Sequence, residues 1–359
     1  MKIAIVTIND NNNYGNRLQN YATQEMLKKM YRSVQEVYTI KNSSIINRKT
    51  NLFEYFLRIF KFLYRKFKYR TKNKRQICFN EFNYKVTWTK KTFNWLEKSK
   101  FSSFDYYIVG SDQVWNPYYR LSEFELLDFV NDEKKVAFSA SISAEEIPDN
   151  MKLFAKERFL KFKAISVRED KGKEIIEDLT GRKDIEVLVD PTMLLTSDEW
   201  DKVAKRPEQL QRDKYILTYF LGELSDSRKK EIQRIAKEND CEVINLLDEN
   251  DAFFATGPSE FLYLEKNAFL ICTDSFHSSI FAILYNRPFV IFNREGNVQG
   301  MNSRIETLLS KFKLENREYN GKNITNENLH HDYTEAYKIL EQEREKSKNF
   351  LQKALDIKE

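Results

Sequence analysis

Residues 267–291, NAFLICTDSFHSSIFAILYNRPFVI, carry the pattern of one strand, one helix and a second strand. The apolar run 268–272 has the length of a buried strand, and the polar residues 273–275 supply turn and N-cap chemistry. Apolar residues then recur at helical spacing until Asn-Arg-Pro at 286–288 ends the helix, and the run 289–292 predicts the next strand. This order is typical of parallel α/β sheets, which bind ligands at the carboxyl ends of their strands.

His277 lies in the first turn of the predicted helix, directly after Ser275 and Phe276. It is one of three histidines in 359 residues, and histidine ordinarily titrates near neutral pH, which suits proton transfer. A packing histidine near a helix cap explains the same placement equally well. His277 is therefore a candidate catalytic residue that the rest of the chain must support.

The composition predicts a soluble, cytoplasmic protein of about two domains. Hydrophobic residues make up 41% of the chain, and 27 Phe with 19 Tyr make its cores aromatic. The three cysteines are far apart in the sequence and offer neither a natural pair nor metal-ligand spacing, as expected in a reducing compartment. The first residues, 1–7, are too short an apolar run for a signal peptide and predict a first strand. No run approaches the ~20 apolar residues of a membrane span.

The net charge of +5 is concentrated in one segment, residues 48–75. This segment has eleven Lys or Arg and one acid, hence +10, which leaves −5 for the remainder and argues against a general nucleic-acid binder. As a helix it would place Phe53, Phe56, Leu57, Phe60, Leu63 and Phe67 on one side and basic groups along the flanks. We expect this basic arm to contact an anionic membrane surface. A helix packed on the protein with a solvated basic face, and RNA binding by stacking, are the alternatives.

Polar residues follow the first predicted strand, which ends at Ile8. A loop leads to a helix from about Arg17, and Asn16, Arg17, Gln19 and Asn20 lie at its start. Helix N-termini favour anions or hydroxyl-rich ligands, so these residues are candidate acceptor-binding residues. An ordinary Asn cap with surface polar residues is the alternative.

A second polar group follows the predicted strand 104–109. Gly110 allows a sharp exit from the strand, after which Asp112, Gln113 and Trp115 would project at its carboxyl end. A carboxylate, an amide and an indole together suit a sugar, because they offer hydrogen bonds and a flat apolar face. The alternative is that Asp112 caps the turn and Trp115 belongs to the core.

Three positions in the later chain suit an anion. Arg168 directly follows a predicted strand and could grip a carboxylate or phosphate, or else pair with a neighbouring acid. Ser259 lies in a Pro-initiated helix start, which is either a phosphate seat or simply a well-capped helix. Arg304 lies in the first turn of a helix, where a cation opposes the helix dipole unless an anion is near or the side chain points to solvent.

The chain divides into two α/β sets. Alternating strand and helix patterns fill residues 1–195, a polar stretch with Pro207 follows, and a second set begins at Tyr215. We expect an N-terminal Rossmann-like acceptor domain over 1–195, a C-terminal Rossmann-like donor domain over 196–333, and a final helix over 334–359 that is free to pack back on the first domain.

Six of these motifs stand in a fixed order along the chain. They are NYGNRLQNYA at 13–22, VGSDQVWN at 109–116, SVRE at 166–169, DPT at 190–192, TDSFH at 273–277 and NSR at 302–304. Each motif alone is weak, but the ordered set resembles the polysaccharide pyruvyl transferase family. The resemblance implies two doubly wound, Rossmann-like halves facing a cleft, similar to glycosyltransferases of the two-Rossmann type.

The resemblance also implies a reaction. The donor would be phosphoenolpyruvate and the acceptor a hydroxyl pair of a glycan, in the biosynthesis of a cell-surface polysaccharide such as an exopolysaccharide or capsule. By similarity, the donor contacts fall on Arg168, His277 and Arg304, with Ser275, Phe276, Asn302, Ser303 and Ser259 around them. Some branches of the family have an arginine where this chain has Ser275, a departure that Arg304 could compensate.

These residue types fit the chemistry. Phosphoenolpyruvate is a small multiple anion that suits two arginines and helix N-termini, and the cyclic ketal forms with acid–base groups and without a metal or cofactor. His277 is assigned to acid–base work and Asp112 to orienting or deprotonating an acceptor hydroxyl. The basic arm suggests an acceptor presented at the inner face of the plasma membrane, on a lipid diphosphate carrier.

Two other functions remain open at the level of the sequence. A nucleotide-sugar glycosyltransferase of the same architecture would need a late carboxylate for the ribose, for which Glu295 is a candidate. An inactive scaffold of a glycan-assembly complex would keep the anion site without turnover.

Overall fold

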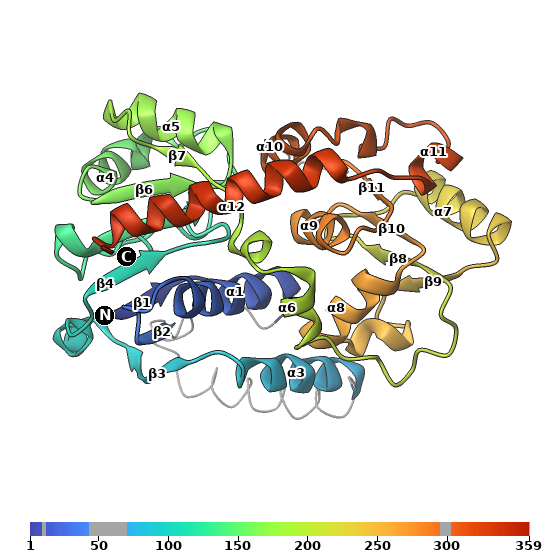
Figure 1. The fold of residues 1–359 in the computed structure, drawn as a ribbon, viewed down its shortest axis with the longest axis horizontal. Coiled ribbons are helices and arrows are strands. Elements are labelled where there is room, and N and C mark those ends of the chain that lie inside the picture. Colours follow the sequence, from blue (N-terminus) through green and yellow to red (C-terminus); the bar gives the residue numbers. More distant parts are fainter. Residues whose placement is uncertain (9–11, 43–69, 295–302, 359) are drawn as a thin grey trace, which may run out of the picture.

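Two separate parallel sheets divide the chain into an N-terminal and a C-terminal half (Figure 1). The computed structural model describes residues 1–8, 12–42, 70–294 and 303–358. The predicted α/β class is confirmed, because every strand pair in both sheets is parallel and helices connect the strands.

The N-terminal sheet has seven strands in the order β3-β2-β1-β4-β5-β6-β7. They are β1 (Lys2–Val6), β2 (Glu36–Asn42), β3 (Trp88–Phe93), β4 (Tyr106–Val109), β5 (Lys135–Ala140), β6 (Ala164–Val167) and β7 (Glu186–Val187). The strand order reverses between β1 and β4, which pair through Val6 and Val109 at their carboxyl ends. A reversal of this kind is the topological switch point at which doubly wound sheets bind ligands.

Helices flank this sheet because its strands are apolar on both faces. Along β1, Ile3 and Ile5 belong to one buried cluster and Ala4 and Val6 to another, as alternation along a strand requires. The connecting segments are α1 (Tyr14–Met30), α3 (Arg70–Asn83), α4 (Asp149–Phe159) and α5 (Asp170–Thr180), with 3₁₀ turns η1 (Trp95–Phe101), η2 (Asp132–Lys134) and η3 (Pro191–Leu194). Asn13 caps α1 by accepting a hydrogen bond from the Asn16 N–H at 3.4 Å.

The C-terminal sheet has four strands in the order β11-β10-β8-β9. They are β8 (Tyr215–Tyr219), β9 (Glu242–Asn245), β10 (Leu270–Thr273) and β11 (Phe289–Ile291). Around them lie α6 (Ser197–Asp201), α7 (Asp226–Glu238), η4 (Ala252–Ala255), α8 (Pro258–Asn267), α9 (Phe276–Leu284), α10 (Ser303–Phe312), η5 (Glu315–Arg317) and α11 (Asn326–Leu329). The strand–helix–strand unit predicted from residues 267–291 is confirmed as β10, α9 and β11. Its switch point lies between β8 and β10.

The last helix, α12 (Thr334–Ala354), runs across both halves (Figure 1). Near its start the Tyr337 hydroxyl donates to the Ile283 carbonyl of the C-terminal half at 2.9 Å. Near its middle Arg344 donates to the Met193 and Leu195 carbonyls at 2.8 and 3.0 Å. Just beyond its end, Asp356 pairs with Lys163 of the N-terminal half. The helix therefore ties the two halves together.

The two halves also share one buried core. Tyr14, the first residue of α1, stacks on Phe261 of α8 with ring centroids 4.4 Å apart. Arg75 of α3 donates to the Tyr14 hydroxyl at 2.6 Å and to the Phe254 carbonyl of the C-terminal half at 2.9 Å. Apolar contact and buried hydrogen bonds thus hold the start of α1 against the second half.

Most of the basic arm, residues 48–75, lies outside the described residues, so its predicted helix and membrane contact stay predictions. Its end belongs to α3, which begins at Arg70. Within the described ranges, no helix is both long and apolar enough to cross a membrane.

Candidate functional site

Five ionisable side chains from both halves meet beside the two switch points. They are Asp112, which follows β4, Arg168, which follows β6, Asp190, which precedes η3, His277 in the first turn of α9, and Arg304 in the first turn of α10. We call this set the charged cluster. All five are at least nine-tenths buried, so their charges interact with little screening by water. The structure thus joins Arg168, His277 and Arg304, which the sequence predicted to bind one anion.

Asp190 is the central acceptor of the charged cluster. One of its carboxylate oxygens, Oδ2, accepts hydrogen bonds from Arg168 Nη1 and Ser111 Oγ, both at 2.8 Å, and lies 3.5 Å from His277 Nε2. The other accepts from the Thr192 N–H and hydroxyl at 3.0 and 2.7 Å. Burial opposes the charge, but His277 and Arg168 outweigh it and hold the pKa of Asp190 well below its usual value. Asp190 therefore stays a carboxylate that orients Arg168 and His277.

Asp112 is a second buried carboxylate of the charged cluster, and residues of the N-terminal half fix its position. Its backbone has φ 71°, and its Oδ1 accepts from the Gln113 N–H at 2.8 Å and lies 3.6 Å from Arg168 Nη2. Its Oδ2 accepts from the Asn16 amide. Burial raises the pKa of Asp112, but the charges of Arg168, His277 and Arg304 lower it by more than burial raises it. The pKa of Asp112 is therefore below its usual value. Asp112 is thus a fixed carboxylate beside the arginines.

The imidazole of His277 occupies space that a glycine leaves open. A Cβ added at Gly15 of α1 would lie 2.0 Å from His277 Nδ1 and 2.5 Å from Cε1 and Cγ. On its other side, Nε2 faces Asp190. Close contact with the α1 backbone and attraction to a carboxylate therefore fix the position of the ring.

Arg304 is a buried cation among other cations. Its Nη1 donates to the Ser143 hydroxyl at 3.3 Å, and it forms no salt bridge within the part of the chain that the structure describes. When the Gln113 amide is turned so that its nitrogen donates to Tyr119, its oxygen accepts from the Arg304 guanidinium. Burial and the charges of Arg168 and Arg294 lower the pKa of Arg304 to about 10. An anion bound here would relieve that repulsion.

The loop that carries Ser143 is held by Glu169. One carboxylate oxygen of Glu169 accepts from the Ile142 and Ser143 N–H groups at 2.8 and 3.1 Å and from the Ser141 hydroxyl at 3.0 Å. Within the described ranges Glu169 forms no salt bridge with Arg168, the alternative that the sequence left open. Arg168 pairs with Asp190 instead.

The N-terminus of α9 faces the same cations. Ser275 is its N-cap and makes no side-chain capping hydrogen bond, and the ring of Phe276 lies 4.3 Å from the Arg168 guanidinium carbon. The first N–H groups of a helix have no partner within it and, with the dipole, attract an anion. Asp274 holds the neighbouring switch point by accepting from the Leu221 and Gly222 N–H groups, both at 2.7 Å.

The residues predicted to bind an acceptor lie in different places. Arg17 is buried and donates to Asn83 Oδ1 and the Ile8 carbonyl. Asn16 and Gln113 contact members of the charged cluster, as described above. Gln19 and Asn20 are fully buried, and both make hydrogen bonds inside the first half: Gln19 donates to Thr7 Oγ1 at 2.7 Å and accepts from the Ser111 N–H at 3.1 Å. Gln19 therefore positions the loop that carries Asp112 and does not face a ligand.

The expected sugar-stacking role of Trp115 does not fit its place in the structure. Its ring is fully buried against Phe159 and Phe162, and its indole N–H donates to the Glu125 carbonyl at 3.1 Å. The core alternative is correct, because a turn after the strand sends this large side chain inward. Tyr119 is an exposed aromatic side chain beside the charged cluster, and its hydroxyl accepts from the Gln113 amide nitrogen when the amide oxygen accepts from Arg304.

Two further predicted residues lie elsewhere. Ser259 is in the first turn of α8, where its carbonyl accepts from the Lys205 N–H at 2.9 Å, and within the described ranges it forms no hydrogen bond with the charged cluster. Asn302 is outside the described residues, and Ser303 begins α10. The central residue that sequence reasoning did not assign is Asp190, although its motif follows a strand and the rule used for Arg168 applies to it.

The fold and the charged cluster together define a two-sheet α/β protein with buried ionisable side chains gathered beside its two switch points. The family model for polysaccharide pyruvyl transferases matches residues 13–296. The chain therefore belongs to the polysaccharide pyruvyl transferase family. Comparison with curated protein sequences gives no significant match.

Solved structures of similar fold include three that match over almost the whole chain. A Listeria monocytogenes protein assigned as a UDP-N-acetylglucosamine 2-epimerase has 11% identity and a TM-score of 0.48, covering 97% of this chain and 90% of its own. The UDP-GlcNAc 2-epimerase of Methanocaldococcus jannaschii has 16% identity and a TM-score of 0.45, with 95% and 99% covered. The kitacinnamycin glycotransferase has 10% identity and a TM-score of 0.44, with 98% and 97% covered.

Proposed function

We propose that this protein transfers the pyruvyl group of phosphoenolpyruvate to two hydroxyls of a glycan and releases phosphate. The observation that carries the proposal is Arg304, a buried guanidinium whose pKa is lowered to about 10 beside Arg168 and which forms no salt bridge within the described residues. Two arginines, a helix N-terminus and a histidine around one point suit a compact molecule with a carboxylate and a phosphate. Membership of the family supports the same chemistry.

The reaction balances without a further reactant. A proton adds to the methylene carbon of phosphoenolpyruvate, and one glycan hydroxyl attacks C2 and loses its proton. The second hydroxyl then displaces phosphate from C2, so the product is a cyclic ketal with a new methyl group. Of the two hydroxyl protons, one balances the proton on the methyl carbon and the other leaves with phosphate.

Each member of the charged cluster has a role in this scheme. Arg168 and Arg304 bind the donor anion and stabilise charge as phosphate leaves. His277 delivers the proton, and Asp190 stabilises its protonated form from 3.5 Å. Asp112 orients an acceptor hydroxyl, and Asn16 fixes its carboxylate.

Phosphate release tests the proposal. Wild-type protein with phosphoenolpyruvate and a library of lipid-linked or synthetic glycans should release phosphate, whereas His277→Ala should lose at least about 100-fold. In parallel, phosphoenolpyruvate should raise the unfolding temperature more than UDP or a UDP-sugar does. Near-normal release by His277→Ala would refute the histidine's role. Stabilisation by UDP alone would instead favour a nucleotide-sugar glycosyltransferase, and donor binding without turnover on any glycan would favour a scaffold.

We also propose that the acceptor belongs to a cell-surface polysaccharide and reaches the enzyme on a lipid diphosphate at the membrane. The basic residues of 48–75 other than the buried Arg75 support this, since each basic group near an anionic leaflet contributes about 1 kcal/mol. Sedimentation with anionic vesicles should disappear when residues 48–69 are deleted, a deletion that keeps the buried Arg75 of α3. It should persist when exposed neutral residues elsewhere on the surface are replaced. Sedimentation unchanged by the deletion would exclude the arm as a membrane contact.

A further inference from the structure

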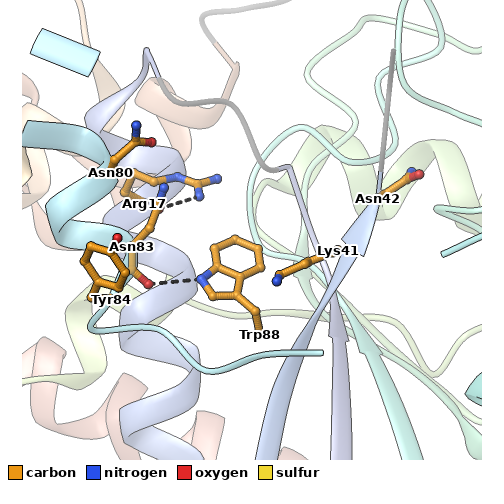
Figure 2. A pocket seen from close by; sticks show the side chains of 7 residues that line it. All are labelled: Arg17, Lys41, Asn42, Asn80, Asn83, Tyr84 and Trp88. Carbon is orange, nitrogen blue, oxygen red and sulfur yellow. Dashed lines mark hydrogen bonds between the residues drawn. The ribbon is translucent and has the colours of Figure 1, made fainter. Parts of the chain in front are cut away.

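A hollow of about 430 Å³ lies in the N-terminal half, away from the charged cluster. Figure 2 shows Trp88 between Asn83 and Tyr84, at the end of α3, and Lys41 at the end of β2. Arg17, Asn42 and Asn80 complete the lining. The hollow therefore sits between the carboxyl end of β2, the start of β3 and the end of α3.

The lining has the chemistry of a site for an acidic sugar. It combines two cations, three side-chain amides and two aromatic rings, and no acidic residue is among the described residues that line it. Amides exchange hydrogen bonds with hydroxyls, and aromatic faces cover the apolar side of a sugar ring. The exposed ammonium group of Lys41 favours a negatively charged substituent, such as a carboxylate or a phosphate.

The aromatic part of this hollow is fixed in place. The indole N–H of Trp88 donates to the Asn83 carbonyl at 3.0 Å. The guanidinium of Arg17 lies 5.6 Å from the Trp88 ring centroid and is itself held by Asn83 Oδ1 at 3.0 Å and the Ile8 carbonyl at 3.1 Å. Tyr84 is 89% exposed and Lys41 is exposed, so both are accessible to a ligand. A rigid platform with accessible flanking groups lowers the entropic cost of binding.

The hollow is also connected to the reaction centre through α1. Asn16, which donates to Asp112, and Arg17, which backs Trp88, are consecutive residues in the first turn of that helix. A glycan that presents one sugar to Asp112 can therefore place a neighbouring sugar on the other side of the same turn.

We propose that this hollow is an acceptor subsite for a saccharide unit that carries an anionic group, one or more residues away from the sugar that receives the pyruvyl group. The inference rests on the proposed function for its place in the reaction, but the binding itself is independent of donor chemistry. Trp88 and Tyr84 supply the ring contacts, the amides bind hydroxyls, and Lys41 binds the anionic substituent.

Calorimetric titration of the full chain tests the subsite with defined probes. These are a hyaluronan tetrasaccharide, which carries glucuronate, neutral chitotetraose, and glucose 1-phosphate. At least one acidic probe should bind at least about tenfold tighter than chitotetraose. Trp88→Ala should weaken that binding about tenfold or more, and Lys41→Gln about threefold to fivefold. Preference for the uronate identifies a carboxylate as the anionic group, and preference for the sugar phosphate identifies a phosphate.

Two controls keep the experiment decisive. Lys90→Gln changes an exposed lysine that does not line the hollow, in β3, the strand that carries Trp88. This variant should leave saccharide binding unchanged. Tyr84→Ala removes a side chain that is 89% exposed and cannot unfold the protein by losing a core contact, so it replaces Trp88→Ala if that variant misfolds. Equal affinity for acidic and neutral probes, binding unchanged by Trp88→Ala and Tyr84→Ala, or no binding of any acidic probe would overturn the subsite.

The same samples separate this inference from the donor proposal. Phosphoenolpyruvate should raise the unfolding temperature of Trp88→Ala as much as that of the wild type. If phosphoenolpyruvate has no effect on either protein while Trp88→Ala loses saccharide binding, the donor proposal fails and the subsite stands. If the donor effect is present and the variants bind saccharide normally, the subsite fails and the donor proposal stands.

Discussion

Replacing Gly15 by Ala tests the closest contact in the charged cluster. The new Cβ would lie 2.0 Å from His277 Nδ1, whereas ordinary van der Waals contact begins near 3.4 Å, so the imidazole would have to retreat by about 1.4 Å. It cannot retreat freely, because Nε2 faces Asp190 at 3.5 Å and the ring packs edge-on against Phe276. The substitution therefore displaces the proposed proton donor without removing any chemical group.

Two opposing effects set the expected change in stability. Overpacking a buried site costs about 1–3 kcal/mol. Alanine in place of glycine in a helix stabilises by up to about 1 kcal/mol. Gly15→Ala should therefore lower the free energy of unfolding by roughly 0–3 kcal/mol. A displacement of the catalytic group of more than ~1 Å should reduce phosphate release about 100-fold or more.

A double-mutant cycle isolates the steric cause. In a His277→Ala background the clash is absent, and Gly15→Ala should raise the free energy of unfolding by up to about 1 kcal/mol through helix propensity alone. The coupling energy between the two positions should be about 1–3 kcal/mol. Urea unfolding of the four proteins measures it, and phosphate release by the two proteins that retain His277 measures the effect on activity.

A Gly15→Ala protein that is more stable than the wild type and equally active would refute the reasoning. So would a coupling energy near zero, because it would mean that the alanine and the imidazole do not compete for the same space.

Three further substitutions test the electrostatics and the packing. Asp190→Asn should destabilise the protein at pH 7 but reduce the loss of stability at acid pH. The folded pKa of Asp190 is depressed, so its stabilisation is complete above the usual pKa of about 3.9 and is lost as pH falls below that value. Urea unfolding at pH 7, 5 and about 3 measures the free energy of unfolding, and an equal loss at acid pH in both proteins would contradict the prediction. Arg304→Met should leave the unfolding temperature without ligand unchanged or raised, because it removes a buried, repelled cation, while abolishing stabilisation by phosphoenolpyruvate; stabilisation retained by the variant would contradict the donor site. Trp115→Phe should cost about 1–3 kcal/mol by leaving the Glu125 carbonyl without its donor, with an unchanged acceptor KM; an increased KM at normal stability would restore the sugar-stacking role.

Local patterns were sufficient for the fold class and for the region of the site. Residues 267–291 predicted the β10–α9–β11 unit because strand, cap and helix patterns depend on neighbouring residues alone. Arg168 and His277 were found by one rule, that polar residues after parallel strands converge on one edge of a sheet. That rule depends only on the strands being parallel, and not on how the rest of the chain folds.

Side-chain direction could not be predicted in the same way. Trp115 and Tyr119 follow the same strand, and only the tertiary structure decides that the tryptophan points into the core and the tyrosine toward Gln113. Gln19 lies one turn beyond Asn16 on the same helix, but its side chain packs against the sheet and accepts a hydrogen bond from the Ser111 N–H.

By itself, the sequence determined two parallel α/β halves and the family motifs, and it predicted that Arg168, His277 and Arg304 bind one anion. Only the tertiary structure decided that Asp190 lies at the centre, that Gly15 makes room for His277, and that Arg304 is a buried cation without a carboxylate partner in the described chain. The physical reason is range: helix and strand patterns arise from residues a few positions apart. The ion pairs of the charged cluster join residues 22 to 87 positions apart in the sequence, which only folding brings together.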